Sequence, residues 1–402
     1  MKKISLLSLL FAALVFVLPL HAQEDKEKDE KENAYEFEMI HDIPTTPVKN
    51  QYRAGTCWSY SGLALLESEL LRLDKGEFDL AELWVVRKAY EDKADNYVRM
   101  HGKTNFGGGG AFYDVLYVYE HYGMLPESEY KGLKYGTDNH VHGELDKVLK
   151  NFVDAVIKNK NKELTTAWKK AYKGILDAYL GIIPEVFDYD GNSYTPKTFA
   201  DGLGLNMDNY INITSYTHHP FYEQFILEIP DNWQWAESWN LPMEEMMEVL
   251  DNAMENGYTV AWGSDVSEKG FSWKHGVAIV PSEERPDLDG LEKDKWKNLD
   301  DKEKKKKLYS FEEILPEKDI TQEMRQKAFD NYKTTDDHGM LITGKAKDQE
   351  GNIYYKVKNS WDTDNIYDGY FFASRAFVSY KTMNLVVHKD AIPKQIRKKM
   401  GM

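Results

Sequence analysis

A single cysteine is the residue of this sequence whose type and surroundings fit nucleophilic catalysis. Cys57 is the single cysteine among 402 residues, and it opens a stretch with apolar residues at helical spacing. Its thiol should therefore lie at a helix N-terminus, where the positive end of the dipole favours the reactive thiolate. A thiolate that attacks a carbonyl also needs a base, a group that orients the base, and donors for the oxyanion.

The sequence offers candidates for these partners. His338 and His275 each lead an apolar β-like run, so the residues alone leave both histidines open as the base.

The elements that must position these residues fall into two groups along the chain. Apolar residues at helical spacing predict helices over 57–73, 81–95 and 113–121. Short apolar and aromatic runs predict strands at 258–262, 276–280, 340–343, 354–358, 370–372 and 385–388. Helices first and strands later indicate an α+β protein with a helical lobe and a β-rich lobe.

Three further segments complete the expected organisation. Residues 37–402 read as one domain, and within it residues 140–256 read as a mostly helical inserted subdomain. Residues 283–307 are rich in lysine and acidic side chains, which indicates a charged surface excursion. Residues 23–36 are too charged to pack, so they should form a flexible leader.

The first 22 residues carry the features of a signal peptide. Two lysines precede an apolar run over residues 4–20, and Leu20-His21-Ala22 resembles a small-residue cleavage site. A membrane-anchoring helix is the alternative, but the run is short for a span and no basic cluster follows it. We therefore expect export to the periplasm or the extracellular space, with no membrane attachment after cleavage.

Charge and histidine spacing exclude other classes of function. The formal net charge is −16, and no stretch supplies the basic stripe that a nucleic-acid partner requires. The pairs His140–His142 and His218–His219 lack the third and fourth ligands of a usual metal site. We expect neither a metal nor another cofactor.

Three motifs resemble those of the papain-like cysteine peptidases. QYRAGTCWSY places Gln51, Cys57 and Trp58 as in the family signature, residues 337–344 resemble the histidine strand, and Lys358-Asn359-Ser360-Trp361 resembles the asparagine motif. Ordinary members place the histidine about 130 to 150 residues after the cysteine, and here the spacing is about twice as long. Together with residues 259–270 and 329–340, this spacing resembles the bleomycin hydrolase and aminopeptidase C branch.

The resemblance implies a two-lobed papain-like fold and a role for each matching residue. Cys57 would be the nucleophile, His338 its base and Asn359 the group that orients the histidine. We favour His338 over His275, since only His338 lies on the strand that leads through a turn to Asn359. Gln51 and the backbone N–H of Cys57 would bind the oxyanion. Trp361 would shield the histidine–asparagine hydrogen bond, while Trp58, Gly109 and Gly110 would line the peptide-binding cleft.

The resemblance also implies a thioester mechanism on a peptide substrate, aminopeptidase specificity, and a homo-oligomer that is a hexamer in that branch. In the branch, an extended C-terminal arm meets the free α-amino group of the substrate. Here residues 389–402 are basic and shorter than that arm. An endopeptidase with an open cleft, a papain-like acyltransferase and a non-catalytic binding protein are the alternatives.

Overall fold

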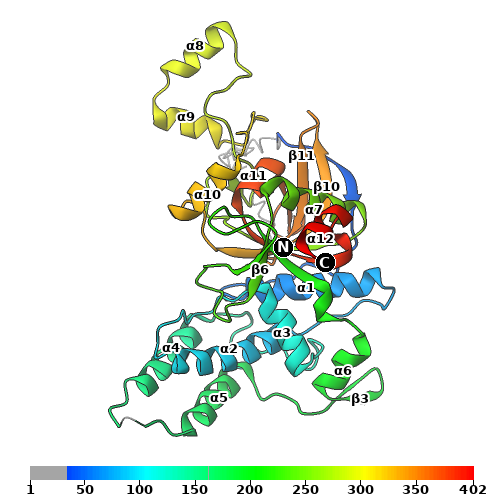
Figure 1. Cartoon of the computed structure of the whole chain (residues 1–402), viewed down its shortest axis with the longest axis vertical. Helices are drawn as coiled ribbons and strands as arrows, with labels where there is room; N and C mark the ends of the chain where they lie inside the picture. The colour runs from blue at the N-terminus through cyan, green and yellow to red at the C-terminus, as the bar shows by residue number, and fades with distance from the viewer. Residues whose placement is uncertain (1–33, 162) are drawn as a thin grey trace, which may run out of the picture. The chain divides into compact units, whose positions relative to one another are not determined.

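One mixed β-sheet and a layer of helices packed against it make up most of the fold (Figure 1). The computed structural model describes residues 34–161 and 163–402. The predicted signal peptide and most of the charged leader lie outside these residues.

The sheet runs in the order β5-β6-β4-β13-β7-β10-β11-β12-β9-β8, and β1 pairs with β10 in addition. Most neighbours are antiparallel, whereas β4 with β6 and β9 with β12 are parallel. The strands are β1 (Phe37–Asp42), β4 (Tyr210–Thr214), β5 (Gln224–Ile226), β6 (Glu237–Asn240), β7 (Val260–Ser264), β8 (Phe271–Ser272), β9 (Val277–Ala278), β10 (His338–Asp348), β11 (Ile353–Lys358), β12 (Tyr370–Ser374) and β13 (Thr382–His388).

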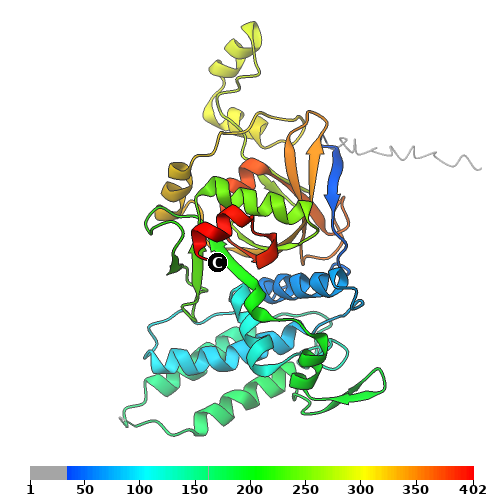
Figure 2. The same cartoon turned by 45° about the vertical axis from the view of Figure 1, so that its right-hand side comes forward.

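In the helical lobe, α1 lies between the sheet and the other helices (Figure 2). The helices of this lobe are α1 (Cys57–Arg72), α2 (Glu82–Arg99), α3 (Phe112–Tyr122), α4 (Gly143–Ile157), α5 (Ala167–Leu180) and α6 (Pro196–Leu203). Gly62 lets α3 approach α1 closely, because a Cβ there would lie 2.6 Å from the Val115 side chain. Leu63, Leu66 and Val115 are fully buried in the core between these helices.

The sheet lobe has a core of its own. Apolar side chains of β7, β10 and β13 pack against α7 (Met243–Glu255), and Trp262 and Leu250 are fully buried there. The lobe is completed by α10 (Gln322–Asp330), α11 (Arg375–Lys381) and α12 (Lys394–Met400), with short 3-10 turns at Met207–Asn209 and Lys389–Ala391. The described part therefore has the predicted helical and β-rich lobes.

The expectation that residues 140–256 are mostly helical is wrong for part of that segment. After α4, α5, the small hairpin β2 (Phe187–Tyr189) and β3 (Asn192–Tyr194), and α6, the chain enters the large sheet through β4, β5 and β6. Ile213 is fully buried, and its strand pairs with β13 and β6. These strands are short, and long-range pairing rather than local periodicity defines them.

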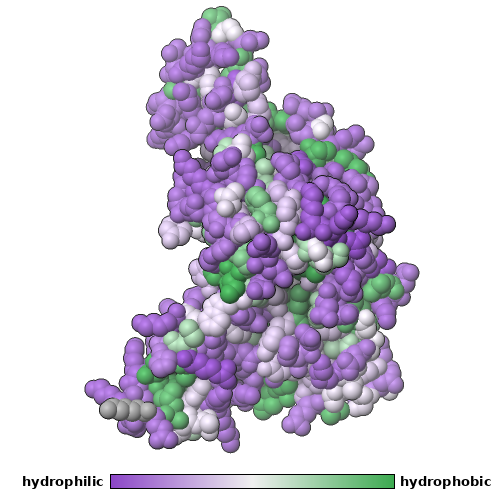
Figure 3. Space-filling model, in the orientation of Figure 1, coloured by the Kyte–Doolittle hydropathy of each residue, from purple (hydrophilic) through white to green (hydrophobic). Residues whose placement is uncertain are grey.

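The charged excursion forms two short helices, α8 (Gly290–Asn298) and α9 (Asp301–Leu308). Its surface is mainly hydrophilic (Figure 3). Trp296 and Leu308 are buried within the excursion and form a small apolar cluster with Leu315. Separately, none of the helices in residues 34–161 and 163–402 is long and apolar enough to cross a bilayer.

Candidate active site

Cys57 is the first residue of α1, as the sequence predicts. The residue is partly buried, and α1 packs against β10, the strand that begins with His338. Gly339 makes this approach close, since a Cβ there would lie 2.9 Å from the Ser61 hydroxyl of α1. The packing of α1 on β10 thus brings the cysteine and the histidine to one cavity, which both residues line.

His338 and Asn359 form a buried hydrogen-bonded pair. The Nε2 atom of His338 lies 2.7 Å from Oδ1 of Asn359. The Asn359 oxygen also accepts the backbone N–H of Ser360 at 2.8 Å, which fixes the orientation of the amide. Nε2 of the histidine must therefore carry the proton and donate it, so Nδ1 is the unprotonated nitrogen.

Trp361 covers this pair. Its ring stacks on the His338 ring with centroids 4.6 Å apart and an interplanar angle of 30°. Burial lowers the pKa of His338, while the hydrogen bond to Asn359 and the charge of Asp337 raise it. The net direction is downward, so the imidazole is held neutral and ready to accept a proton.

Gln51 is tied to the asparagine motif. Its side-chain Nε2 donates to the carbonyl of Ala54 at 2.7 Å, and its Oε1 accepts from the Ser360 hydroxyl at 2.6 Å. The backbone N–H of Gln51 donates to the carbonyl of Ser360 at 2.9 Å. One N–H of the Gln51 amide thus remains available, and the side chain cannot easily rotate away.

Trp58, Gly109 and Gly110 lie along the wall next to the cysteine. Trp58 is buried and donates its Nε1 proton to the carbonyl of Gly108 at 3.2 Å. Gly110 lines the cavity with Cys57, and a Cβ at Gly110 would lie 2.7 Å from the Trp58 ring. The predicted substrate-binding residues, apart from Trp361, are therefore neighbours on one side of the cavity.

The electrostatic surroundings of the thiol include two carboxyl groups that sequence reasoning missed. Burial raises the pKa of Cys57 to about 12, hydrogen bonds from the backbone of Gly339 and Trp58 lower it, and the charges of Asp336 and Asp231 raise it. Both aspartates line the same cavity as Cys57. A thiolate would form here with proton transfer to His338, because the imidazolium would offset these negative charges.

His275, the rival base, lies elsewhere. Its Nδ1 atom is 2.7 Å from the Ser272 hydroxyl, and its ring stacks on Phe311 with centroids 5.1 Å apart. It is not among the residues that line the cavity of Cys57. His338 is therefore the histidine that shares a site with the cysteine.

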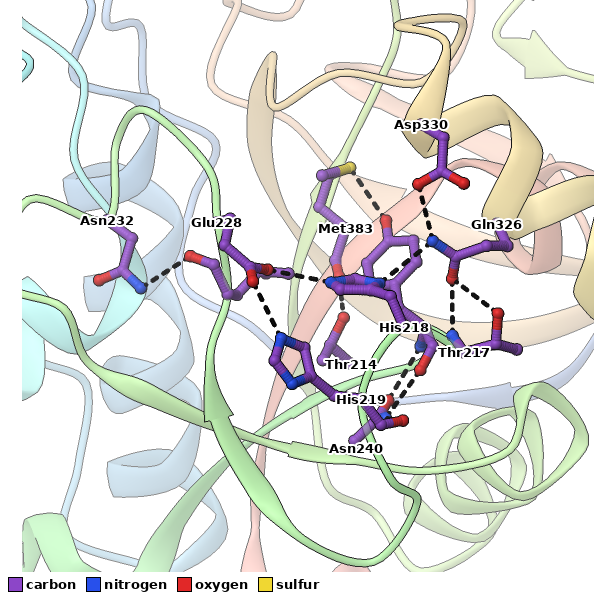
Figure 4. A network of polar contacts seen from close by, with 12 residues as sticks. Thr214, Thr217, His218, His219, Glu228, Asn232, Asn240, Gln326, Asp330 and Met383 are labelled. Atoms are coloured by element: carbon purple, nitrogen blue, oxygen red, sulfur yellow. Dashed lines mark hydrogen bonds and ion pairs between the residues drawn. The ribbon is translucent and has the colours of Figure 1, made fainter.

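One group of metal-type ligands occurs in the described part of the chain, formed by His218, His219 and Glu228 (Figure 4). The two Nε2 atoms lie 3.0 and 2.9 Å from the Glu228 carboxylate. Gln326 accepts the backbone N–H of Thr217 with its oxygen and donates to Nδ1 of His218. Nε2 of a neutral His218 must then carry the proton, which fits a hydrogen bond to Glu228 better than a metal bond. Absence of a metal stays a prediction.

The other histidine pair has a different environment. His142 is fully buried, and burial together with His140 lowers its pKa to about 4. Both ring nitrogens of His142 lack a hydrogen-bond partner among the described residues.

Comparisons with known proteins find similar sequences over most of the chain. A model of the Peptidase C1-like family matches residues 13–303 and 290–402. Aminopeptidase C of Streptococcus thermophilus is 24% identical over 410 residues, which cover 91% of this chain and 85% of the relative. Aminopeptidase C of Listeria monocytogenes is 24% identical over 401 residues, which cover 89% and 83%.

A solved structure gives the same indication for the fold. The crystal structure of PepW from Lactobacillus rhamnosis HN001 superposes with a TM-score of 0.66 at 20% identity, covering 90% of this chain and 84% of that chain. The predicted α+β papain-like fold is therefore confirmed.

Proposed function

The chain belongs to the Peptidase C1-like family and is a cysteine-type peptidase, and from this premise we propose that it is an exported aminopeptidase. The observation that carries the proposal is the joint placement of Cys57 and His338 in one cavity, with Asn359 bonded to the histidine. The similarity to relatives named Aminopeptidase C supports the specificity for peptide N-termini.

In the first half of the reaction, Nδ1 of His338 accepts the thiol proton of Cys57, and the sulfur attacks the carbonyl carbon of the scissile bond. The protonated imidazole then gives its proton to the leaving amine as the C–N bond breaks, which leaves a thioester on Cys57. Asn359 holds the imidazole in the orientation that both transfers need.

The negative charge that develops on the carbonyl oxygen needs hydrogen-bond donors. The remaining side-chain N–H of Gln51 and the backbone N–H of Cys57 are the donors we assign. A donor of this type contributes about 3 to 4 kcal/mol to the stability of the transition state in other enzymes. Water, deprotonated by His338, then attacks the thioester and releases the acyl product.

Export rests on the sequence of the first 22 residues. The two lysines, the apolar run and Ala22 have the order of a signal peptide, and we propose action on peptides in the periplasm or outside the cell. The thiol would then work in an oxidising compartment, so full activity should require a reductant. Fractionation of cells that produce the full chain tests this proposal, and uncleaved protein in the cytoplasm would contradict it.

The activity test compares two substrates that differ at the amino group. A fluorogenic aminoacyl amide with a free α-amino group should be cleaved under reductant, and its N-acetylated counterpart should be cleaved far more slowly. Cys57→Ala and His338→Ala should abolish cleavage of both. Preferential cleavage of internal bonds in N-blocked peptides would instead establish an endopeptidase, and an active Cys57→Ala would overturn the mechanism.

A further inference from the structure

A loop of the sheet lobe crosses to the helical lobe beside the cavity of Cys57. This loop, residues 227–236, joins β5 to β6. The indole N–H of Trp233 donates to Asp114 Oδ2 at 2.9 Å, and the amide of Gln234 donates to Asp114 Oδ1 at 2.6 Å. Asn96 of α2 donates to the carbonyl of Trp233 at 2.7 Å. The loop is therefore anchored to α2 and α3.

The anchored loop places the Asp231 carboxylate directly over Gly109. A Cβ built at Gly109 would lie 1.9 Å from Oδ2 of Asp231, so the carboxylate fills the space next to this glycine. Asn105 donates to Oδ1 of Asp231 at 2.9 Å and helps to hold it there. Gly109 is the position expected to lie along the substrate backbone. A chain that extended past this point would collide with Asp231.

A second carboxyl group reaches the same cavity from the segment just before the strand of the catalytic histidine. Asp336 lies two residues before His338, and among the described residues its side chain has no hydrogen-bond or ion-pair partner. Its sequence neighbours are held in place. The backbone N–H of Thr335 donates to Asp265, and the Asp337 carboxylate accepts from the backbone N–H of Val266 and the hydroxyl of Ser267. Asp336 is thus held in the cavity with its acceptor oxygens unused.

Tyr113 supplies a third polar group close to these two carboxyl groups. Its hydroxyl oxygen is buried and has no hydrogen-bond partner within the described part of the chain. Burial, followed by the charges of Asp114, Asp336 and Asp231, raises the pKa of Tyr113 well above its usual value. A buried hydroxyl without a partner costs free energy, typically about 1 to 3 kcal/mol, and a bound donor would remove that cost.

We propose that Asp231 and Asp336, with the hydroxyl of Tyr113, bind the α-ammonium group of the substrate, and that loop 227–236 closes the cleft beyond it. This inference rests on the proposed aminopeptidase function and names its specificity determinant. An ammonium group has three N–H donors, and this set offers three acceptor groups, two carboxylates and one hydroxyl. Two features would make the enzyme specific for free N-termini. The carboxylates would pair with the positive charge of the ammonium group, and loop 227–236 would block chains that extend further.

The other charged groups near Asp231, Asp336 and Tyr113 are consistent with the binding of an ammonium group there. The ammonium of Lys93 lies among the charges of Asp231, Asp114 and Asp146, but it donates to the carbonyls of Gly107 and Gly109. Asp114 accepts a hydrogen bond from Trp233 of the loop, and Asp337 accepts one from Ser267 in the segment after β7. Burial and the charges of Asp231 and Asp337 raise the pKa of Asp336 to about 8. A cationic ligand would relieve this repulsion.

The last residues of the chain occupy a different place. Ile396 and Met400 of α12 are buried in the core of the sheet lobe, and Lys399 pairs with Glu245 of α7. None of residues 389–402 lines the cavity of Cys57. The acidic groups that reach the substrate side in the described structure come from loop 227–236 and from the segment just before β10.

The test uses the full mature chain and the two fluorogenic substrates. Asp231→Asn and Asp336→Asn should each lower kcat/KM for the free-amino substrate, mainly through KM, by about 30-fold or more, as for a buried charge that loses its partner. Cleavage of the N-acetylated substrate should stay the same or rise. Glu228→Gln is the matched control, because it removes a carboxylate from the same loop that is bound to His218 and His219.

Inhibition of the wild-type enzyme keeps the proposal testable if the variants fold poorly. Leucine amide should inhibit the wild-type enzyme at a concentration at least about tenfold lower than N-acetyl-leucine amide, a difference of about 1.4 kcal/mol. Either asparagine variant should reduce this preference.

The outcomes separate the two proposals. Wild-type enzyme that cleaves neither substrate would overturn the proposed function. Wild-type enzyme that prefers the free-amino substrate, with the preference kept in both asparagine variants, would overturn the assignment of the aspartates alone.

Discussion

The Nε2 atom of His338 lies 2.7 Å from the Oδ1 atom of Asn359, although His338 begins β10 and Asn359 follows the end of β11. The strands β10 and β11 are antiparallel, and Leu341 lies opposite Lys358. The start of β10 and the end of β11 therefore lie side by side, which brings His338 next to Asn359. The asparagine is neutral, so it orients the imidazole without adding a charge. A carboxylate here would add a further negative charge near the thiol.

Asn359→Ala should lower kcat roughly 10²-fold, at the lower end of what a positioned acid–base group contributes. The imidazole would lose its fixed orientation and tautomer, while KM should change little because Asn359 does not line the cavity of Cys57. Steady-state kinetics on the free-amino substrate checks this. Asn298→Ala, at an exposed position on α8, is the matched control, and an unchanged kcat in Asn359→Ala would contradict the assigned role.

Gln51→Ala should lower kcat by about 10²- to 10³-fold, the usual effect of removing one oxyanion donor. KM should remain close to the wild-type value, because the donor acts mainly on the transition state. Since Gln51 also accepts from Ser360, thermal unfolding must be measured beside the kinetics. Gln395→Ala on α12 is the control. If the loss of activity only follows a loss of folded protein, the oxyanion assignment fails.

Asp336→Asn should make Cys57 more reactive, although it should impair binding of free N-termini. The charge of Asp336 raises the pKa of Cys57, so its removal should lower that pKa and increase the thiolate fraction. Because the pKa of Asp336 is about 8, the difference should appear at pH 9 and vanish near pH 6.

Rates of iodoacetamide labelling of Cys57 at these two pH values check the electrostatic argument. A one-unit shift in pKa would correspond to about a tenfold change in thiolate. Equal rates in the wild type and in Asp336→Asn at pH 9 would show that the carboxylate does not act on the thiol.

The sequence was sufficient for the parts of the site that lie at element boundaries. Cys57 at the start of α1 and His338 at the start of β10 follow from local periodicity and short motifs. Asp231 and Asp336 could not be found in this way, because an aspartate in a polar loop has no distinguishing local pattern. Their placement depends on how loop 227–236 is anchored to Asp114, which only the tertiary structure shows.

The lack of a local sequence pattern also explains why the expectation of a mostly helical segment is wrong for residues 210–240. Strands β4 to β6 are three to five residues long, too short for alternation to be recognised. Asn240 holds this region together, because its side chain donates to the carbonyls of Tyr216 and His219. Such contacts across a loop have no signature in a single sequence, whereas the long helices α1 and α2 do.

Glu317→Gln should remove part of the pH dependence of stability. Burial raises the pKa of Glu317 to about 7, while hydrogen bonds from the Ser374 hydroxyl and the Val280 backbone lower it. Between the unfolded value of 4.5 and about pH 7, the folded state keeps a proton that the unfolded state loses. Stability therefore falls as pH rises through this window and is constant above it.

The contribution of Glu317 amounts to at most about 3 to 4 kcal/mol, from a shift of some two and a half pKa units. The free energy of unfolding in urea, measured at pH 5 and pH 8, should thus fall less in Glu317→Gln than in the wild type. Glu292→Gln, at an exposed position on α8, should behave like the wild type. Since Glu82 and Asp114 also have raised pKa values, the informative quantity is the difference between variant and wild type. Equal losses in the variant and the wild type would mean that Glu317 is already ionised at pH 5.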